Sequence, residues 1–505
     1  MAYSYRRPNR DQLLLLPPDV RDWLPEDHLV WFVLEVVAKV DLAAFHELHP
    51  NDGVGRRAYD PEMMLALLVY AYCTGTRSSR RIAAGCRTDL AMKVICCDVV
   101  PEHDAISRFR ADHEQAIRDA FIDVLTLCAR IGLASLGIVS IDGTKIAADA
   151  ALDANRTESA IRAEVDRILA EGRANDEQEA TQPALAGDGV EVAARPTGRL
   201  ARLEAALAEI EAERESRREA GAAQAARLAG DAAAGRRPRG RIPKDPARAL
   251  ERARADLEAA QVNERAASSV LAKLQATENR RRAERAFAKA REAREATPAA
   301  PEPEANTTDP ESRIMKTTSG WIQGYNAQAA VNENQVVLAA LVTAEVNDVK
   351  QLLPVIAVVQ QNAARSAVPG EIGTVLADAG YWSETNATAP GPARLIATTK
   401  DWKQRRAARE MGTTTGPAPE GATPLEAMEH RLRTEEGAGE YAKRSFTVEP
   451  VFGQVKENRG FRRFMRRGLG AGASEWSLIC ATTNILKMFA FADGRSLGAL
   501  LASEP

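Results

Sequence analysis

The spacing of apolar and polar positions changes three times along the chain, and the first region, residues 1 to about 130, is typical of helices. Asp60 is placed to cap a helix with Pro61 in its first turn, and the apolar run 63–72 continues it. A Thr-Gly-Thr break at 74–76 precedes short arginine-bearing helices near 82–86 and 104–110. This pattern fits a helix-turn-helix DNA reader, and it fits a plain helical bundle equally well.

The second pattern is a set of short apolar, β-branched runs that predict buried strands. One covers 136–142 and ends in Asp142; others cover 324–331, 336–346, 374–378 (ending in Asp378) and 393–398. A helix is expected at 348–364, an irregular polar excursion at 403–440, and helices from about 441 to 501.

The third pattern is an Ala-, Arg- and Glu-rich stretch from about 155 to 310. It carries coiled-coil spacing, which predicts an antiparallel helical hairpin turning within 229–246, and a helix at 158–171 is compatible with it. The predicted seam positions are Leu200, Leu203, Leu207 and Ile210, then Leu250, Leu257 and Leu271, with Ala253, Ala260, Ala267 and Leu274.

With this insertion set aside, the remaining elements follow the order of a ribonuclease-H-like α/β domain, a mixed sheet flanked by helices. In that order the first and fourth strands are neighbours, which predicts that Asp142 and Asp378 lie about 5 Å apart at the backbone. We therefore expect a helical N-terminal domain (1–130), an α/β domain (131–154 plus 311–505) and a coiled-coil helical insertion (155–310) between the first and second strands.

Length and composition suit such a protein. At 505 residues, 45% hydrophobic and 27% charged, two or three domains are expected. The apolar run 13–18 is too short for a membrane span and lacks a cleavage site, so a cytoplasmic, nucleoid-associated protein is expected. A zinc site built from Cys86, Cys96, Cys97 and His103 fits no standard spacing, so buried reduced thiols are the favoured interpretation.

The net charge is −3, but residues 441–470 hold eight cations against two acids, or +6. This density indicates a phosphate-binding surface, although a solvated basic helix face would show the same pattern. The cations are Lys443, Arg444, Lys456, Arg459, Arg462, Arg463, Arg466 and Arg467, and the acids are Glu449 and Glu457.

Asp142, Asp378 and Glu449 are the candidate catalytic residues. Each alone has an ordinary structural explanation as a turn or helix-start residue. If the predicted topology brings the three carboxylates together, their repulsion calls for divalent cations among them. Two hard cations roughly 4 Å apart are what phosphodiester cleavage and transfer use.

Four motifs in this order give a specific resemblance: Ile141–Lys145 (IDGTK), Gly324–Gln328 (GYNAQ), Ala377–Tyr381 (ADAGY) and Val448–Lys456 (VEPVFGQVK), the last continuing as 457–463 (ENRGFRR). Together they resemble the insertion-sequence DDE transposases. The resemblance implies that Asp142, Asp378 and Glu449 bind two Mg²⁺ or Mn²⁺ ions. It also implies that the partners are terminal inverted repeats and target DNA, engaged by a homodimer.

The resemblance extends to a Tyr-Arg-Glu-Lys signature, supplied here by Tyr441, Arg444, Glu449 and Lys456, with one residue more than usual between the arginine and the glutamate. We expect Lys456 to contact a phosphate near the cleaved bond. The predicted DNA-binding residues are Tyr441, Arg444, Lys456, Arg459, Arg462 and Arg463. Pro450 implies either a helix start or a kink.

Four aromatic residues are candidate stacking platforms for an unpaired base, although aromatics near strand ends more often belong to the core. They are Trp321, Tyr325, Trp382 and Trp402. Two alternatives to transposition stay open: a nuclease of the same fold that does not join ends, and a non-catalytic or inactive DNA-binding protein that uses the coiled coil and basic helices alone.

Overall fold

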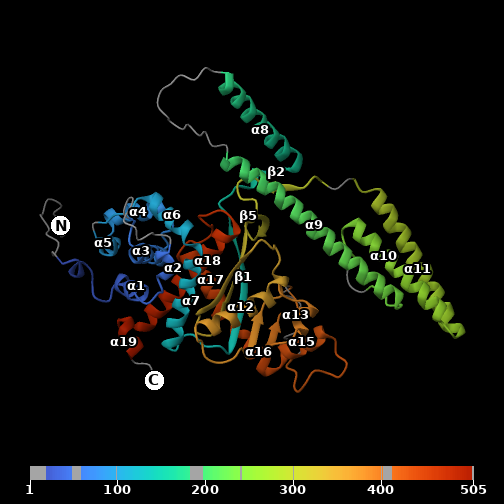
Figure 1. Ribbon diagram of the computed structural model, residues 1–505. Coiled ribbons are helices and arrows are strands. Elements are labelled where there is room, and N and C mark those ends of the chain that lie inside the picture. Colours follow the sequence, from blue (N-terminus) through green and yellow to red (C-terminus); the bar gives the residue numbers. More distant parts are fainter. Residues whose placement is uncertain are drawn as a thin grey trace, which may run out of the picture. The chain divides into compact units, whose positions relative to one another are not determined.

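The computed structural model describes residues 19–47, 58–97, 99–181, 197–238, 242–298, 301–399, 401 and 412–502. The chain divides into two compact units, one formed by residues 1–152 with 311–505 and the other by residues 153–310. The first unit is a mixed α/β structure whose sheet is flanked by helices (Figure 1).

The sheet is organised around β1 (Ile138–Ala147), which pairs antiparallel with β5 (Gly320–Val331) and parallel with β7 (Thr374–Ala377). Beyond β7 lies β8 (Ala393–Ile396), also parallel. On the other side, β4 (Arg313–Thr317) and β6 (Val337–Thr343) pair with the first and second halves of β5. The first and fourth of the strands expected from the sequence are β1 and β7, and they are adjacent and parallel, as predicted.

β1 does not end at Asp142, as the apolar run had suggested, but continues to Ala147. The reason is that β5 pairs with β1 along this whole stretch, from Asp142 opposite Ala329 to Ala147 opposite Gly324. The pairing with β7 on the opposite side stops at Ile141. Asp142 thus lies inside a long strand, at the point where its parallel neighbour ends.

Helix α18 (Leu469–Ala492) is almost entirely buried and ties the sheet to the N-terminal helices. The Asn484 side chain accepts a hydrogen bond from the Val337 amide (2.8 Å) and donates one to the Val337 carbonyl (2.9 Å). Trp476 donates from its indole to the Gln328 carbonyl at 2.9 Å. Helices α7 (Glu114–Arg130) and α12 (Leu352–Arg365) also pack in this unit.

The N-terminal helices share one continuous hydrophobic core with the sheet. They are η1 (Val20–Trp23), α1 (Leu29–Val37), α2 (Ala43–His46), α3 (Pro61–Cys73), α4 (Ser79–Thr88), α5 (Leu90–Cys96) and α6 (His103–Asp112). The predicted cap is confirmed, because the Asp60 side chain accepts from the Glu62 amide and Pro61 opens the helix.

The segment 403–440, expected to be irregular, contains helices in its described part: α15 (Pro424–Arg433) and α16 (Glu435–Ala442). The start of α15 has a recognisable sequence pattern, because Thr423 and Glu426 form a capping box with Pro424 in the first turn. The remaining elements are η3 (Asp348–Lys350), α13 (Glu384–Thr388), α17 (Arg444–Gly453), the π-helical turn η4 (Gln454–Asn458) and α19 (Leu497–Ala502). Among the described helices, none has the length and apolarity to cross a bilayer.

The second unit holds α8 (Glu158–Thr181), α9 (Thr197–Ala233), α10 (Pro246–Ala266) and α11 (Val270–Glu295), with η2 (Leu152–Ala154) at its start. The last two helices lie side by side (Figure 1). A short antiparallel pair, β2 (Asn155–Thr157) and β3 (Glu304–Asn306), joins its two ends.

Part of the predicted seam is buried and part is not. Leu203 and Ile210 pack with Ile161 in a small core, whereas Leu271 and Leu274 are 76% and 66% exposed. The prediction was wrong for those two leucines because the helix breaks after Ala266 and restarts at Val270. A break resets the helical phase, so the heptad spacing does not carry across it.

Candidate active site

Asp142 and Asp378 lie at equivalent positions on neighbouring parallel strands. The register of β1 and β7 pairs Ile141 with Ala377, so the two acids directly follow the last paired residues. The Gly143 amide donates to Asp142 Oδ1 at 2.9 Å. The Gly380 amide donates to Asp378 Oδ1 at 2.7 Å.

Glu449 comes from α17, which is held against β1. The hydroxyls of Thr447 and Ser140 lie 2.7 Å apart in a buried hydrogen bond, and Val448 and Val451 face the core. Pro450 neither starts nor ends this helix: it lies inside α17, which continues to Gly453 and passes into η4. Glu449 itself keeps a largely exposed side chain, at 55%.

Arg444 connects the acid on β1 to the acid on α17. Its Nη2 lies 2.7 Å from Asp142 Oδ2, and its Nη1 lies 3.2 Å from Glu449 Oε1. The arginine side chain is only 11% exposed. The structure therefore gathers Asp142 and Glu449 around a guanidinium, with Asp378 near enough to act on the charge of both Asp142 and Arg444.

The electrostatics of this site concentrate negative charge. Burial, together with the neighbouring Asp378 and Asp348, raises the pKa of Asp142 to about 6, although Arg444 opposes the rise. Burial and the surrounding carboxylates, Asp142 foremost, also raise the pKa of Tyr381 well above its ordinary value. A buried group of acids needs compensating positive charge to stay ionised.

The donor chemistry fits a hard divalent cation, because every candidate ligand is a carboxylate oxygen. Within the described ranges, no group of three or more His, Cys, Asp or Glu side chains is already arranged to hold an ion. The guanidinium of Arg444 takes the position between two of the acids instead.

A polar cluster beside the acids was not predicted from the sequence. Asn326 and Gln328, both fully buried on β5, donate to Asp348 Oδ1 at 2.7 and 2.9 Å. Tyr381 donates its hydroxyl hydrogen bond to Gln328 Oε1, and Lys145 Nζ lies 3.6 Å from Asp348 Oδ1. The signal was two polar residues two positions apart within an otherwise apolar strand, which places both on one face.

The predicted DNA-binding residues lie at different places in the first unit and differ in their hydrogen-bond partners. Lys456 Nζ donates to the Lys145 carbonyl at 3.2 Å, and Arg463 Nε donates to the Ala148 carbonyl at 3.2 Å, so both cations lie along the far end of β1. Tyr441 hydroxyl donates to the Ala377 carbonyl, 3.4 Å away and one residue before Asp378.

Arg444 is buried and Arg459 is half-buried, so neither side chain is fully presented on the surface. Arg459 donates to the hydroxyls of Thr482 and Thr483 and lies over the Phe461 ring, 5.1 Å from its centroid. These contacts tie η4 to α18, so the structure does not support a phosphate contact by Arg459. Arg462 remains exposed and pairs with Glu457.

The +6 patch is largely neutralised by acids distant in sequence. Lys443, Arg466 and Arg467 pair with Glu333, Glu114 and Asp149, at 2.7, 2.6 and 3.1 Å. A count along the chain could not include these partners. Among the described cations predicted to contact DNA, Lys456 and Arg463 have hydrogen bonds to carbonyl oxygens and no ion pair with a carboxylate within 4.0 Å.

The four aromatic residues predicted as stacking candidates differ in exposure. Tyr325 is fully buried and contacts Phe464 in the core, whereas Trp321 is 60% exposed on β5. Trp382 is half-buried against the core, and Trp402 lies outside the described residues.

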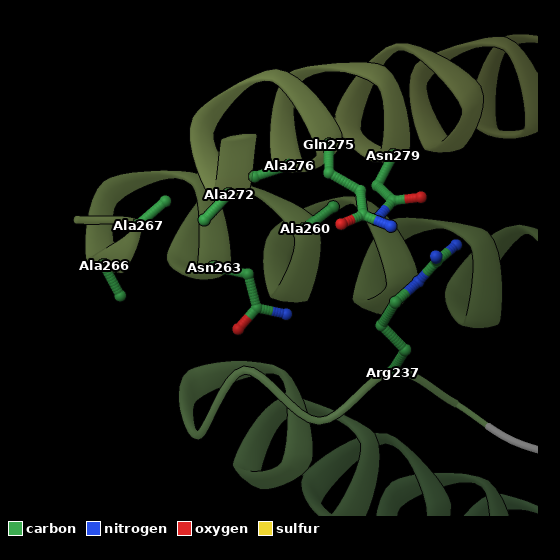
Figure 2. A pocket seen from close by; sticks show the side chains of 9 residues that line it. All are labelled: Arg237, Ala260, Asn263, Ala266, Ala267, Ala272, Gln275, Ala276 and Asn279. Carbon is green, nitrogen blue, oxygen red and sulfur yellow. The ribbon is translucent and has the colours of Figure 1, made fainter. Parts of the chain in front are cut away.

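A cavity of about 300 Å³ lies in the second unit between α10 and α11 (Figure 2). Figure 2 shows Arg237 reaching from the loop after α9 toward these helices. Its guanidinium pairs with Asp256 at 2.6 Å, and Asn263 Nδ2 donates to the Gly235 carbonyl at 2.8 Å. These polar groups fasten the turn between α9 and α10, so we assign this cavity a structural role.

Two protein-family models match the chain. Residues 18–112 match a transposase domain (DUF772), and residues 397–489 match a transposase DDE domain that includes Glu449. No curated protein and no solved structure gives a significant match. The two matches, in this order, confirm the resemblance to the insertion-sequence DDE transposases.

Proposed function

We propose that this chain, whose two matches to transposase-domain models support a resemblance to the insertion-sequence DDE transposases, binds terminal inverted repeats and catalyses metal-dependent DNA strand cleavage and strand transfer. The observation that carries this proposal is that Asp142 and Asp378 directly follow the last paired residues of two neighbouring parallel strands, while Arg444 contacts both Asp142 and Glu449. The strand order, with β1 between an antiparallel β5 and a parallel β7, supports a ribonuclease-H-like catalytic core.

We assign the cation-binding role to Asp142, Asp378 and Glu449. Bound Mg²⁺ or Mn²⁺, as a pair, would activate the attacking oxygen and stabilise the leaving oxygen. The two aspartates are positioned by the sheet and by backbone amides, so their oxygens are oriented before substrate arrives. Glu449, from α17, shares the Arg444 guanidinium with Asp142.

The proposed reaction consists of two phosphoryl transfers, strand cleavage and strand transfer. In cleavage, a water oxygen forms a bond to phosphorus as the phosphorus–O3′ bond breaks, and the freed 3′ oxygen takes a proton. In transfer, the oxygen of that 3′-hydroxyl forms a bond to a target phosphorus as the target phosphorus–O3′ bond breaks, and the proton that the hydroxyl loses is balanced by the proton that the freed target O3′ takes up. We assign Lys456 to a phosphate near the cleaved bond, because its Nζ is held at the end of β1 near Asp142.

The DNA surface we propose combines this end of β1 with the N-terminal helices. Arg77 Nη1 donates to the Arg463 carbonyl at 2.9 Å, which joins the start of α4 to the Arg462–Arg463 loop. Arg80 and Arg81 follow on α4, exposed and without a carboxylate partner within the described ranges. Such unpaired arginines suit phosphate contacts, which supply affinity rather than sequence specificity.

The test uses DNA duplexes made from the sequences flanking the gene, where inverted repeats are expected, with a supercoiled target plasmid and Mn²⁺. Wild type should nick the ends and join them to the plasmid. Asp142→Asn and Asp378→Asn should lose both activities by at least about a thousandfold, given the share of catalysis that such charge stabilisation provides. Asp493→Asn is the matched control, since Asp493 is exposed with a φ of 49°, a conformation that asparagine tolerates.

Two outcomes would favour the alternatives. Release of cut ends without joining would indicate a nuclease of the same fold. Equal activity of wild type and both Asn variants would indicate that the acids are not catalytic and would leave a DNA-binding role alone. We propose a homodimer in the DNA complex because two element ends must be held together, and sedimentation with and without paired-end DNA measures it.

A further inference from the structure

The contact of one buried arginine with two of the proposed metal ligands has a consequence for metal loading. Arg444 Nη2 lies 2.7 Å from Asp142 Oδ2, and its Nη1 lies 3.2 Å from Glu449 Oε1. One guanidinium thus uses two of its nitrogens on acids from two different elements. No other described cation contacts both carboxylates.

The position of Arg444 is set by the fold rather than by a flexible surface. It opens α17, and that helix is fixed to β1 by the buried hydroxyl pair of Thr447 and Ser140. The side chain is 11% exposed, in contrast to 55% for Glu449. Without metal the guanidinium is therefore placed directly against the acids, while the glutamate side chain has room to move.

The arrangement also leaves one donor unsatisfied. Arg444 Nε is buried and has no hydrogen-bond partner. A buried donor without a partner is unfavourable, and in native proteins such a group needs an explanation, for instance an alternative arrangement of the same side chain. Without metal, the Arg444 guanidinium thus forms ion pairs with both acids, but one of its hydrogen-bond donors has no partner.

The acids need positive charge whether or not a metal is bound. Asp378 and Asp348 both act electrostatically on Asp142, so removing the guanidinium without a replacement would leave Asp142 facing two negative neighbours without its compensating charge. A divalent cation on the same oxygens supplies more charge than the guanidinium does, and it would repel a cation 3 Å away. The two therefore compete for the same carboxylates.

We propose that Arg444 is a displaceable counter-ion that holds Asp142 and Glu449 together without metal and is released when a divalent cation binds them. This inference rests on the proposed function, since it takes Asp142 and Glu449 as ligands. It assigns Arg444 a positioning role toward the ligands, distinct from the DNA contact expected from its sequence position.

The first test measures Mn²⁺ binding to the full chain without DNA, by calorimetry and by the electron paramagnetic resonance signal of free Mn²⁺. Arg444→Gln should bind Mn²⁺ about 5- to 100-fold more tightly than wild type, the usual range for coupled sites. Arg444→Lys, which keeps the charge but cannot fork between both acids, should fall between them. Arg466→Gln is the matched control, because Arg466 is a partly buried arginine paired with Glu114 at 2.6 Å elsewhere in the unit.

The second test uses the wild-type protein and so does not depend on a variant folding. Phenylglyoxal modification of Arg444, quantified by mass spectrometry, should rise several-fold when Mn²⁺ is added, while modification of Arg466 should stay constant. Unchanged Arg444 reactivity, or equal or weaker Mn²⁺ affinity in Arg444→Gln, would overturn the proposal. Asp142→Asn separates the two ideas: if Mn²⁺ binds it as tightly as wild type, the proposed metal site itself is wrong.

Discussion

Gly143 is a position beside the acids where the surrounding side chains leave no room for a Cβ. A Cβ at this residue would lie 2.2 Å from Gln328 Nε2, 2.7 Å from Asp348 Oδ1 and 3.0 Å from Asn326 Oδ1. The two amide side chains are fully buried, so they cannot swing into solvent to make room. We therefore expect Gly143→Ala to disrupt the polar cluster beside Asp142.

The magnitude follows from the bonds that must break. To clear a methyl group, Gln328 must give up its bonds to Asp348 and to the Tyr381 hydroxyl, at about 1 kcal/mol each, with more where a buried partner stays unsatisfied. Overpacking adds about 1–3 kcal/mol. Alanine loses less conformational entropy on folding than glycine does, which offsets about 0.5–1 kcal/mol of this loss in stability. The net expectation is a loss of about 2–4 kcal/mol in the free energy of unfolding.

Urea unfolding followed by tryptophan fluorescence measures this change, and the cleavage assay measures its effect on the neighbouring acid. The matched control is Gly439→Ala in α16, where a Cβ would meet no atom within 4 Å and should stabilise the helix slightly. If Gly143→Ala unfolded at the same urea concentration as wild type, the close packing of β1 on the amides of β5 would be refuted.

Burial raises the pKa of Glu475 in the folded protein. The stability that the protonated Glu475 contributes is therefore fully present below about pH 4, near the ordinary glutamate pKa. This contribution is lost as the pH rises through the pKa of Glu475 in the folded state. Urea titrations from pH 4 to 7 should show this decline in wild type and a smaller one in Glu475→Gln. Arg80→Ala and Arg81→Ala should each weaken DNA binding for any sequence and reduce the slope of log affinity against log salt by about one, measured by fluorescence anisotropy; an unchanged slope would place DNA elsewhere. Leu274→Ser should alter stability by less than about 0.5 kcal/mol because the side chain is 66% exposed, whereas Ile210→Ala, at 3% exposed, should cost about 2–5 kcal/mol in the same unfolding assay.

The sequence predicted the strands and the two aspartates well because both have local signatures. An apolar β-branched run followed by an acid is visible without knowing any partner, and Asp378 does follow β7 directly. The end of β1 was missed because it depends on β5, a strand almost two hundred residues away in sequence, which pairs with β1 from Ser140 to Ala147. Strand extent is a property of the pair, not of one run.

The charge pattern was the least predictable feature, because the neutralising acids come from other elements. Arg466 finds Glu114 on α7, and Arg444 finds Asp142 on β1. A local count treats these cations as free for phosphates, whereas folding uses them to join elements. The same limit explains Leu274, where the heptad spacing continues in the sequence although the helix is broken at 267–269.

The positions of the three acids differ in how firmly the fold fixes them, and this bears on how the site would work. Asp142 and Asp378 are set by hydrogen-bonded strands and by backbone amides, so neither moves without disturbing the sheet. Glu449 depends on the packing of α17 and on the reach of an exposed side chain. A π-helical turn directly follows that helix, and such turns mark departures from regular helix geometry that often occur at functional sites. In the proposed site, the sheet would therefore supply a rigid pair of carboxylates, and the helix would supply the third carboxylate together with the arginine proposed to compete for it, so any adjustment of the site would come from α17.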